Sequence, residues 1–357
     1  MKIGIVTQPL HNNYGGLLQN YALQQVLESL GHEVKTLDFV YKQTFIRYLI
    51  ISCRQILAAV IKGRKLSLHP YRLFPTVRIG LTDDFVRKHI KTTRTIHAYT
   101  PEVVKEEDFD AVITGSDQVW RPMYNVYLED MFLKFVPDHV HKIAYAASFG
   151  VDYWEFKPRQ TKRCRKLAKR LRRISVRELS GINLCKHHLQ VDATKVLDPT
   201  ILAGVEAYNP LLLDCGEKKF LFAYVLDITP EKKEFVEQMA KENNLEPRIY
   251  GADQNAQLSV EEWVSMIAHA TMVITDSFHG TVFSILYHKN FYSILNIARG
   301  GTRFSSLLCP LGLENRMGDL SQLRISSASP IDWEKVDHIL DKQRQDSLIF
   351  LTKALKK

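Results

Sequence analysis

The stretch VITDSFHGTVFSIL at 273–286 contains an aspartate, a serine and a histidine whose side chains can bind ligands or take part in catalysis. They lie at the point where a predicted strand is followed by a predicted helix. The first residues of the stretch are typical of a buried strand, and its later apolar residues recur at helical spacing. Asp276 or Ser277 can cap this helix, and the N–H groups and positive dipole end of a helix start bind anions. His279 in the first turn can add a charge or move a proton. The alternative interpretation is a capped helix with a partly buried histidine.

Polar residues also follow three other strand-like runs, and Phe149-Gly150 follows a fourth. In an open α/β sheet, the residues beyond the carboxyl ends of the strands form the binding crevice. We therefore expect these residues to meet, although Asp117 can also cap a helix and Arg177 can also pair with an acid. The residues concerned are Asn13, Tyr14, Gly15, Gly16, Gln19, Ser116, Asp117, Gln118, Trp120, Arg177 and Glu178.

Strand-like runs alternate with helical patterns, which predicts an α/β protein with parallel sheets. In the first half the strand-like runs are 2–7, 33–39, 110–115, 142–149 and 173–177, with a helix near 16–30. In the second half they are 219–226, 248–251, 272–276 and 291–296, with helices near 230–244, near 259–269 and from 277. We expect two Rossmann-like domains facing across a cleft, residues 1–200 and 201–330, and a C-terminal helix within 331–357 that packs back on the body.

The composition is that of a soluble globular protein. The 357 residues, 45% of them hydrophobic and 24% charged, are enough for two domains. The five cysteines include no C-x-x-C pair, and the first strand-like run begins at Lys2 without the features of a signal peptide, so a cytoplasmic location is favoured. There is no G-x-G-x-x-G, no P-loop and no cluster with metal-ligand spacing. We therefore expect no cofactor and no metal.

The net charge of +9 is densest in TKRCRKLAKRLRR at 161–173, whose apolar stripe predicts an amphipathic helix. A second basic and apolar stretch, 45–65, contains Arg47 and Arg54 and so falls short of the run of about 20 apolar residues that spans a membrane. Peripheral contact with an anionic membrane and a solvated basic face are both open interpretations. No nucleic-acid-binding module accompanies the charge, so we expect no nucleic-acid partner. The sequence does not indicate the oligomeric state.

Seven stretches of this sequence match motifs of one protein family, and they occur in the same order as in that family. They are NNYGGLLQNYALQ, ITGSDQVW, AYAASFG, ISVRE, VLDPTIL, ITDSFHGTVFSIL and GTRFSSLLCPLGLENR, and the resemblance as a whole covers residues 3 to about 317. Together they resemble the polysaccharide pyruvyl transferase family. The resemblance implies a fold similar to the B-type glycosyltransferases. It also implies transfer of the pyruvyl group of phosphoenolpyruvate onto two hydroxyls of one sugar, giving a ketal and phosphate.

The resemblance implies roles for the strand-end residues as well. Phosphoenolpyruvate carries a phosphate and a carboxylate, so its site needs cations and oriented N–H donors. His279 is the expected general acid or phosphate ligand, and Asp117 the expected base for the acceptor. The expected phosphoenolpyruvate-binding residues are Arg177, Ser277, His279, Gly280 and Arg303. The expected acceptor-binding residues are Asn13, Tyr14, Gly15, Gly16, Gln19, Ser116 and Gln118.

The implied acceptor is a sugar or lipid-linked oligosaccharide that becomes part of a cell-envelope or exported polysaccharide, such as a capsule. Two other functions stay open. A nucleotide-sugar-dependent glycosyltransferase has the same architecture, but it needs a carboxylate for a ribose and a base-stacking pocket, and neither can be assigned. A non-catalytic anion-binding or membrane-associated assembly protein would keep the fold for its surface. The sequence does not show which sugar or which pair of hydroxyls is modified.

Overall fold

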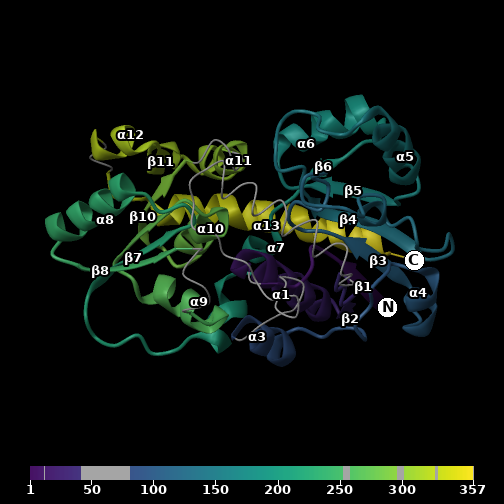
Figure 1. Cartoon of the computed structure of the whole chain (residues 1–357), viewed down its shortest axis with the longest axis horizontal. Coiled ribbons are helices and arrows are strands. Elements are labelled where there is room, and N and C mark those ends of the chain that lie inside the picture. The colour runs from purple at the N-terminus through teal and green to yellow at the C-terminus, as the bar shows by residue number, and fades with distance from the viewer. Residues whose placement is uncertain (12, 42–80, 252–257, 296–300, 326–328, 357) are drawn as a thin grey trace, which may run out of the picture.

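The structure is a computed structural model that describes residues 1–11, 13–41, 81–251, 258–295, 301–325 and 329–356. Two parallel sheets lie side by side, and helix α13 (Trp333–Leu355, yellow) runs across both in the view of Figure 1. The stretch 45–65 lies outside the described residues. Within the described part of the chain, no helix is both long enough and apolar enough to cross a membrane.

The N-terminal sheet has six parallel strands in the order β2-β1-β3-β4-β5-β6. The strands are β1 (Lys2–Val6), β2 (Glu33–Thr36), β3 (Ala111–Thr114), β4 (His141–Ala147), β5 (Arg173–Val176) and β6 (Thr194–Lys195). The helices are α1 (Tyr14–Ser29), α3 (Leu81–His89), α4 (Pro101–Glu106), α5 (Pro158–Ala168) and α6 (Leu179–Leu184). The strand order reverses between β1 and β3, and ligands bind beyond the carboxyl ends of the strands at such a switch point.

The C-terminal sheet has five parallel strands in the order β11-β10-β9-β7-β8. The strands are β7 (Phe220–Val225), β8 (Glu246–Gly251), β9 (Met272–Thr275), β10 (Asn290–Ile294) and β11 (Met317–Gly318). The helices are α8 (Pro230–Glu242), α9 (Val260–His269), α10 (Phe278–Leu286), α11 (Thr302–Leu308) and α12 (Leu320–Ile325). The order of this sheet reverses between β7 and β9, which gives a second switch point.

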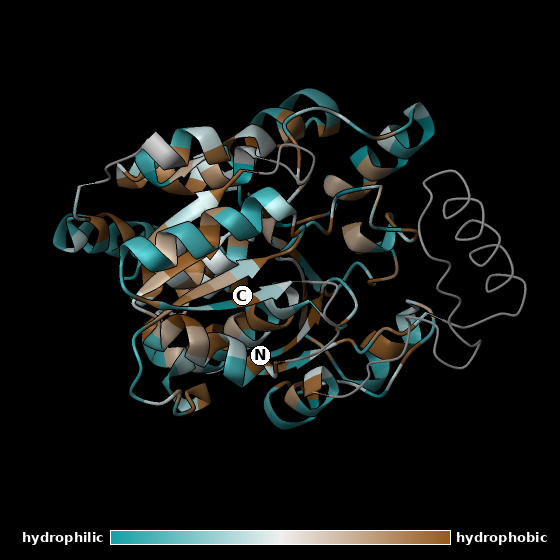
Figure 2. Cartoon of the chain, turned by 60° about the vertical axis from the view of Figure 1, so that its left-hand side comes forward, coloured by the Kyte–Doolittle hydropathy of each residue, from teal (hydrophilic) through white to brown (hydrophobic). Residues whose placement is uncertain are grey.

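One buried apolar cluster joins the two halves. Ile3 and Ile5 of the N-terminal sheet belong to the same cluster as Phe222 and Trp263 of the C-terminal half. Helix α7 (Pro199–Leu202), where the expected domain boundary falls, contacts α1 of one half and α10 of the other. Figure 2 shows the brown, hydrophobic strands inside and much of the teal, hydrophilic colour on the outer helices. The two halves are therefore packed together, and a site at their junction is held from both sides.

The predicted strands and helices form, with ends that differ by a few residues. The run 33–39, for example, is a strand only over Glu33–Thr36. The prediction of a helix over 161–173 is wrong at its C-terminal end, because α5 ends at Ala168. The N–H of Arg172 donates to the carbonyl of Lys142 in β4 (2.7 Å), so the chain already pairs with β4 before β5 begins. Only the first part of the basic stretch is therefore helical.

Candidate functional site

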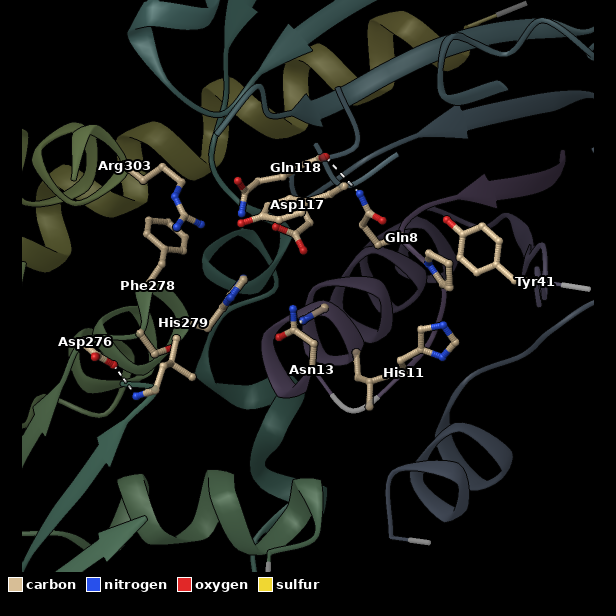
Figure 3. Close-up of a pocket in the computed structure, with 16 residues that line it drawn as sticks. Gln8, His11, Asn13, Tyr41, Asp117, Gln118, Asp276, Phe278, His279 and Arg303 are labelled. Atoms are coloured by element: carbon tan, nitrogen blue, oxygen red, sulfur yellow. Dashed lines mark hydrogen bonds between the residues drawn. The ribbon is translucent and has the colours of Figure 1, made fainter. Parts of the chain in front are cut away.

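A pocket of about 470 Å³ lies where the two switch points face each other. Residues after β1 and β3 form one wall, and residues after β7 and β9 form the other. Figure 3 shows Arg303, Phe278 and His279 on one side, Gln8, His11 and Tyr41 on the other, and Asp117 between them. The lining residues are Gln8, Pro9, His11, Asn13, Gly16, Leu17, Tyr41, Asp117, Gln118, Tyr124, Leu226, Asp276, Ser277, Phe278, His279 and Arg303.

Ser277 caps α10, so the first of the two expected caps is not the one used. The Ser277 hydroxyl accepts the N–H of Gly280 (3.3 Å), and the N–H of Ser277 donates to Thr275 Oγ1 (3.0 Å). These two N–H groups are therefore already satisfied within the chain, and the binding of phosphoenolpyruvate by Ser277 and Gly280 stays a prediction. The first-turn N–H groups of Phe278 and His279 are the remaining candidates at this helix start.

Asp276 binds the neighbouring strand end instead of capping the helix. Its Oδ1 accepts the N–H of Leu226 (2.6 Å), and its Oδ2 accepts Lys232 Nζ (2.8 Å). Gly280 is needed for close packing, because a β-carbon there would lie 2.5 Å from Thr275 Oγ1. Asp276 and Gly280 thus fix α10 against the carboxyl ends of β7 and β9, and this holds the first turn of α10 at the pocket.

His279 is buried at the junction of the two halves. Its Nε2 has no hydrogen-bond partner among the described residues and lies 3.8 Å from Asp198 Oδ2, which is a charge contact and too long for a hydrogen bond. The imidazole also rests against Gly15 in the first turn of α1. A histidine from the C-terminal half is thus held by two groups from the N-terminal half. It borders the pocket, where it can carry a charge or move a proton.

Arg177 does not line the pocket but lies behind it, only 4% exposed. Its guanidinium donates to Asp198 Oδ2 (2.8 Å) and Glu178 Oε1 (2.9 Å), and Nη2 lies 3.8 Å from Asp117 Oδ1. Burial alone would lower the pKa of Arg177, but the three carboxylates raise it above the usual value. Arg177 thus pairs with acids, which is the alternative that the sequence left open, and Nη2 has no hydrogen-bond partner among the described residues. Direct binding of phosphoenolpyruvate by Arg177 stays a prediction. Its position suits it to order the carboxylates.

Arg303 borders the pocket from α11. Among the described residues that line this pocket, it is the one arginine, and none is a lysine. Its guanidinium lies 5.6 Å from the centre of the Phe278 ring, and Arg177 lies 4.8 Å from the same ring. Burial and the charge of Arg177 lower the pKa of Arg303. Arg303 is therefore the arginine placed to meet an anion in the pocket.

Asp117 lines the pocket on the N-terminal side. Its backbone is left-handed, with φ of 66°, and no helix begins after it, so the capping alternative is wrong. Its carboxylate is nearly buried and is oriented by Arg177 at 3.8 Å. A carboxylate at this place can accept a proton from a bound hydroxyl group.

Three of the expected acceptor residues line the pocket, namely Asn13, Gly16 and Gln118. Asn13 caps α1, because its side chain accepts the N–H of Gly16 (3.2 Å). The side-chain oxygen of Gln118 accepts from Arg121 (3.0 Å), and its backbone carbonyl accepts from Gln8 (3.1 Å). Hydrogen bonds of the Gln8, Asn13 and Gln118 side chains therefore stabilise the N-terminal wall of the pocket, which would contact an acceptor.

The other four expected acceptor residues stand behind the wall. The hydroxyl of Tyr14 donates to the carbonyl of Leu258 in the C-terminal half (2.8 Å), and burial raises the pKa of Tyr14 to about 12. Gln19 accepts the N–H of Ser116 (2.9 Å) in a fully buried contact. Gly15 packs against His279. None of Tyr14, Gly15, Gln19 and Ser116 lines the pocket, and their contacts support the residues that do. Their expected contact with an acceptor stays a prediction.

Some site residues were missed from the sequence. Gln8 and His11 directly follow β1, so the same strand-end argument would have included them. Tyr41 and Tyr124 reach the pocket from loops that carry no pattern. Asp198, in the stretch VLDPTIL, contacts both Arg177 and His279. In the described residues, no three His, Cys, Asp or Glu side chains come together as a metal site.

Comparisons with known proteins bear on the family and the fold of the chain. A model of the family described as polysaccharide pyruvyl transferase matches residues 13–296. None of the curated proteins matches the sequence. Among solved structures, a co-structure of S. aureus MnaA with UDP has a TM-score of 0.51 at 11% identity, covering 99% of this chain and 96% of that one. This likeness shows a shared fold of two Rossmann-like domains.

Two further solved structures are similar at lower scores. A UDP-GlcNAc 2-epimerase from Neisseria meningitidis, bound to UDP-GlcNAc, has a TM-score of 0.49 at 9% identity and covers 99% of each chain. The glycosyltransferase SsfS6 from Streptomyces sp. SF2575 has a TM-score of 0.42 at 11% identity and also covers 99% of each chain.

Proposed function

The chain belongs to the polysaccharide pyruvyl transferase family, and we propose that it moves the pyruvyl group of phosphoenolpyruvate onto two hydroxyls of one sugar. The product is a cyclic ketal, and phosphate is released. The observation that carries the proposal is the pocket in which His279, Arg303 and the start of α10 stand on one side and Asp117 on the other.

The C-terminal side of the pocket suits an anionic donor. Arg303 can bind a phosphate or carboxylate through two N–H groups, which lysine cannot do. The first turn of α10 adds the positive end of its dipole and the N–H groups of Phe278 and His279. A small molecule that carries both anions close together would use all of these groups at once.

The reaction needs one acid and one base. A proton from His279 to the methylene carbon of phosphoenolpyruvate makes the adjoining carbon electrophilic, and the first sugar hydroxyl adds there while Asp117 takes its proton. Departure of phosphate regenerates an electrophilic carbon, and the second hydroxyl closes the ring. One of the two hydroxyl protons replaces the proton used on the methylene carbon, and the other leaves with phosphate. His279 and Asp117 both border the pocket, as these steps require.

The N-terminal side suits a sugar acceptor. The side chains of Gln8, Asn13 and Gln118 offer amide groups for hydroxyls, and Tyr41 and Tyr124 offer ring faces. We assign the acceptor to the lipid-linked precursors of a cell-envelope or exported polysaccharide. The enzyme would meet such precursors at the cytoplasmic face of the membrane.

The test is to incubate the protein with phosphoenolpyruvate and a panel of free and lipid-linked saccharides. We expect phosphate release together with the product mass that corresponds to adding pyruvate and losing water. His279→Ala should lower turnover by about 10²–10⁴-fold. His187→Ala, at an exposed position outside the pocket, is the matched control. Thermal stabilisation by nucleotide sugars and none by phosphoenolpyruvate would contradict the proposal and favour a glycosyltransferase.

A further inference from the structure

Asp198 is a buried carboxylate that receives four hydrogen bonds. Its Oδ1 accepts the N–H and the hydroxyl of Thr200 (3.0 and 2.6 Å). Its Oδ2 accepts Arg177 Nη1 (2.8 Å) and the hydroxyl of Ser116 (3.3 Å). The side chain is 1% exposed. A buried acid with this many donors has a fixed position.

The Asp198 carboxyl is ionised at neutral pH. Burial alone would raise its pKa, but His279, Arg177 and Thr200 together hold the pKa well below its usual range. A buried anion is stable only when cations and donors surround it. The group is therefore a permanent negative charge beside the imidazole.

His279 faces this charge with one ring nitrogen. Nε2 is the buried nitrogen, it has no hydrogen-bond partner in the described part of the chain, and it lies 3.8 Å from Asp198 Oδ2. This leaves Nδ1 as the nitrogen that can act on a molecule in the pocket. A carboxylate on one nitrogen of a histidine fixes the ring orientation and favours its charged form.

Four other charged groups surround this pair, two cations and two anions, and their charges cancel. They come from three elements and are Arg177 and Glu178 after β5, Asp117 after β3, and Arg303 in α11. With Asp198 included, the buried cluster has three carboxylates and two guanidinium groups, so it keeps one negative charge while His279 is neutral. A protonated imidazole balances it.

We propose that Asp198 is the positioning residue of His279. Its carboxylate orients the imidazole through Nε2 and stabilises the charged ring, so that Nδ1 presents a proton to the pocket. The use of that proton on phosphoenolpyruvate rests on the proposed function. The pairing of the two side chains does not, and it can be measured without any substrate.

The test compares wild-type protein with Asp198→Asn. The amide keeps the size and one acceptor oxygen but removes the charge. We expect turnover to fall by about 10–100-fold, and the alkaline limb of the pH profile of turnover to move to lower pH. In the ligand-free Asp198→Asn protein, the ¹⁵N chemical shifts of the His279 ring should change from those of the charged form to those of the neutral form at a lower pH than in wild type. A merely structural role of Asp198 would not move these signals.

Thr200→Val is the matched control, because it removes the 2.6 Å hydrogen bond to Oδ1 and leaves the charge beside His279 in place. The ring signals should then follow the wild-type pH dependence. If Asp198→Asn does not fold, Asp198→Glu replaces it. The longer arm keeps the charge but displaces the carboxylate, so turnover should fall while the alkaline limb stays at its wild-type pH.

Two outcomes overturn the proposal. One is a His279 ring that changes its charge at the same pH in wild type and Asp198→Asn, and the other is full turnover in Asp198→Glu. If the His279 ring signals respond to Asp198→Asn but the protein transfers no pyruvyl group, the pairing of Asp198 with His279 is still established. In that case it is the proposed function that is wrong.

Discussion

Gly15 and His279 come from different halves of the chain and meet so closely that a β-carbon at residue 15 would lie 1.9 Å from the imidazole Nδ1. Gly15 is in the first turn of α1, and His279 is in the first turn of α10. Two helix starts therefore converge on one ring, which leaves no room for a side chain at residue 15. Gly15 of the N-terminal motif thus packs directly against the histidine of the C-terminal motif.

Gly15→Ala should displace the imidazole and lower turnover by about 10²-fold, because a shift of about 1 Å in a catalytic group has that effect. Phosphate release measures it. Gly16→Ala is the packing control, since its β-carbon would lie 3.5 Å from the Asn13 side chain, an ordinary contact. Its midpoint of thermal unfolding should not fall, because alanine is favoured over glycine in a helix. Wild-type turnover in Gly15→Ala would show that the ring position is not critical.

Arg303→Gln should weaken phosphoenolpyruvate binding. Loss of a hydrogen bond to a charged group costs about 1.5–3 kcal/mol, so Kd should rise by about 10–100-fold. Isothermal titration calorimetry measures this directly. Arg94→Gln, a change at an exposed arginine that pairs with Glu106, is the control and should leave Kd unchanged. Equal affinities for Arg303→Gln and wild type would place the donor anion elsewhere.

Asp117→Asn should separate chemistry from donor binding. The amide keeps the shape of the side chain but cannot take a proton from the acceptor hydroxyl. If Asp117 is the base, turnover should fall by about 10²–10⁴-fold, while the Kd for phosphoenolpyruvate stays nearly constant. If turnover persists in the folded variant, the base must be another group on the N-terminal wall.

The parts of the fold and site that could be predicted are those that follow from local pattern. Apolar strand-like runs that alternate with helical patterns predicted both sheets, because a parallel strand buried on both faces must be almost wholly apolar. The site followed from strand ends, because the carboxyl ends of parallel strands share one edge. His279 and Asp117 therefore stood out before their neighbours were known, whereas Arg303 was named only through the family resemblance.

Other parts depend on contacts between distant segments. Arg177 shows this, because its partners Asp117 and Asp198 lie in separate loops, and only folding brings the three together. The resemblance implied that Arg177 binds phosphoenolpyruvate, and the structure shows the ion pairs that the sequence left as the alternative. Similarly, the side chain of Thr275 takes the N–H of Ser277, and no spacing rule predicts that contact.

Asp130→Asn should stabilise the protein above neutral pH. Burial raises the pKa of Asp130 from 3.8 to about 6. The folded state therefore binds a proton more tightly than the unfolded state, and stability is lost as the pH rises from about 4 to about 6. Asparagine has no such loss. We expect a gain of about 1–2 kcal/mol at pH 7.5, since each pKa unit is worth about 1.4 kcal/mol and the site is partly exposed.

Thermal or urea unfolding of both proteins at pH 7.5 and pH 4.5 checks this. The gain from Asp130→Asn should shrink at the lower pH, where wild-type Asp130 is protonated in the folded state. Asp108→Asn, in which the replaced side chain is 85% exposed, is the control and should change stability little at either pH. A gain of the same size at both values would mean that the carboxyl charge is not the cause.

The exposed lysines of α5 and the turn after it should hold the protein reversibly on an anionic membrane surface. Arg163 and Arg170 already pair with Glu129 (2.9 Å) and Asp138 (2.8 Å), so the exposed Lys162, Lys166 and Lys169 are the better test. Each basic residue near such a surface contributes about 1 kcal/mol. Changing all three to glutamine should therefore weaken co-sedimentation with anionic liposomes by about 10²-fold. A matched triple change at Lys218, Lys219 and Lys241, exposed in the C-terminal half, should have little effect.

Salt separates this attraction from apolar insertion into the bilayer. The Debye length falls from about 10 Å at 0.1 M to about 3 Å at 1 M salt, so the wild-type protein should be released at high salt and should ignore neutral liposomes at any salt. Binding that survives 1 M salt would point to insertion of apolar side chains. Absence of binding to anionic liposomes at low salt would mean that α5 is a solvated basic face, and the enzyme would then have to capture its lipid-linked acceptor through the pocket alone.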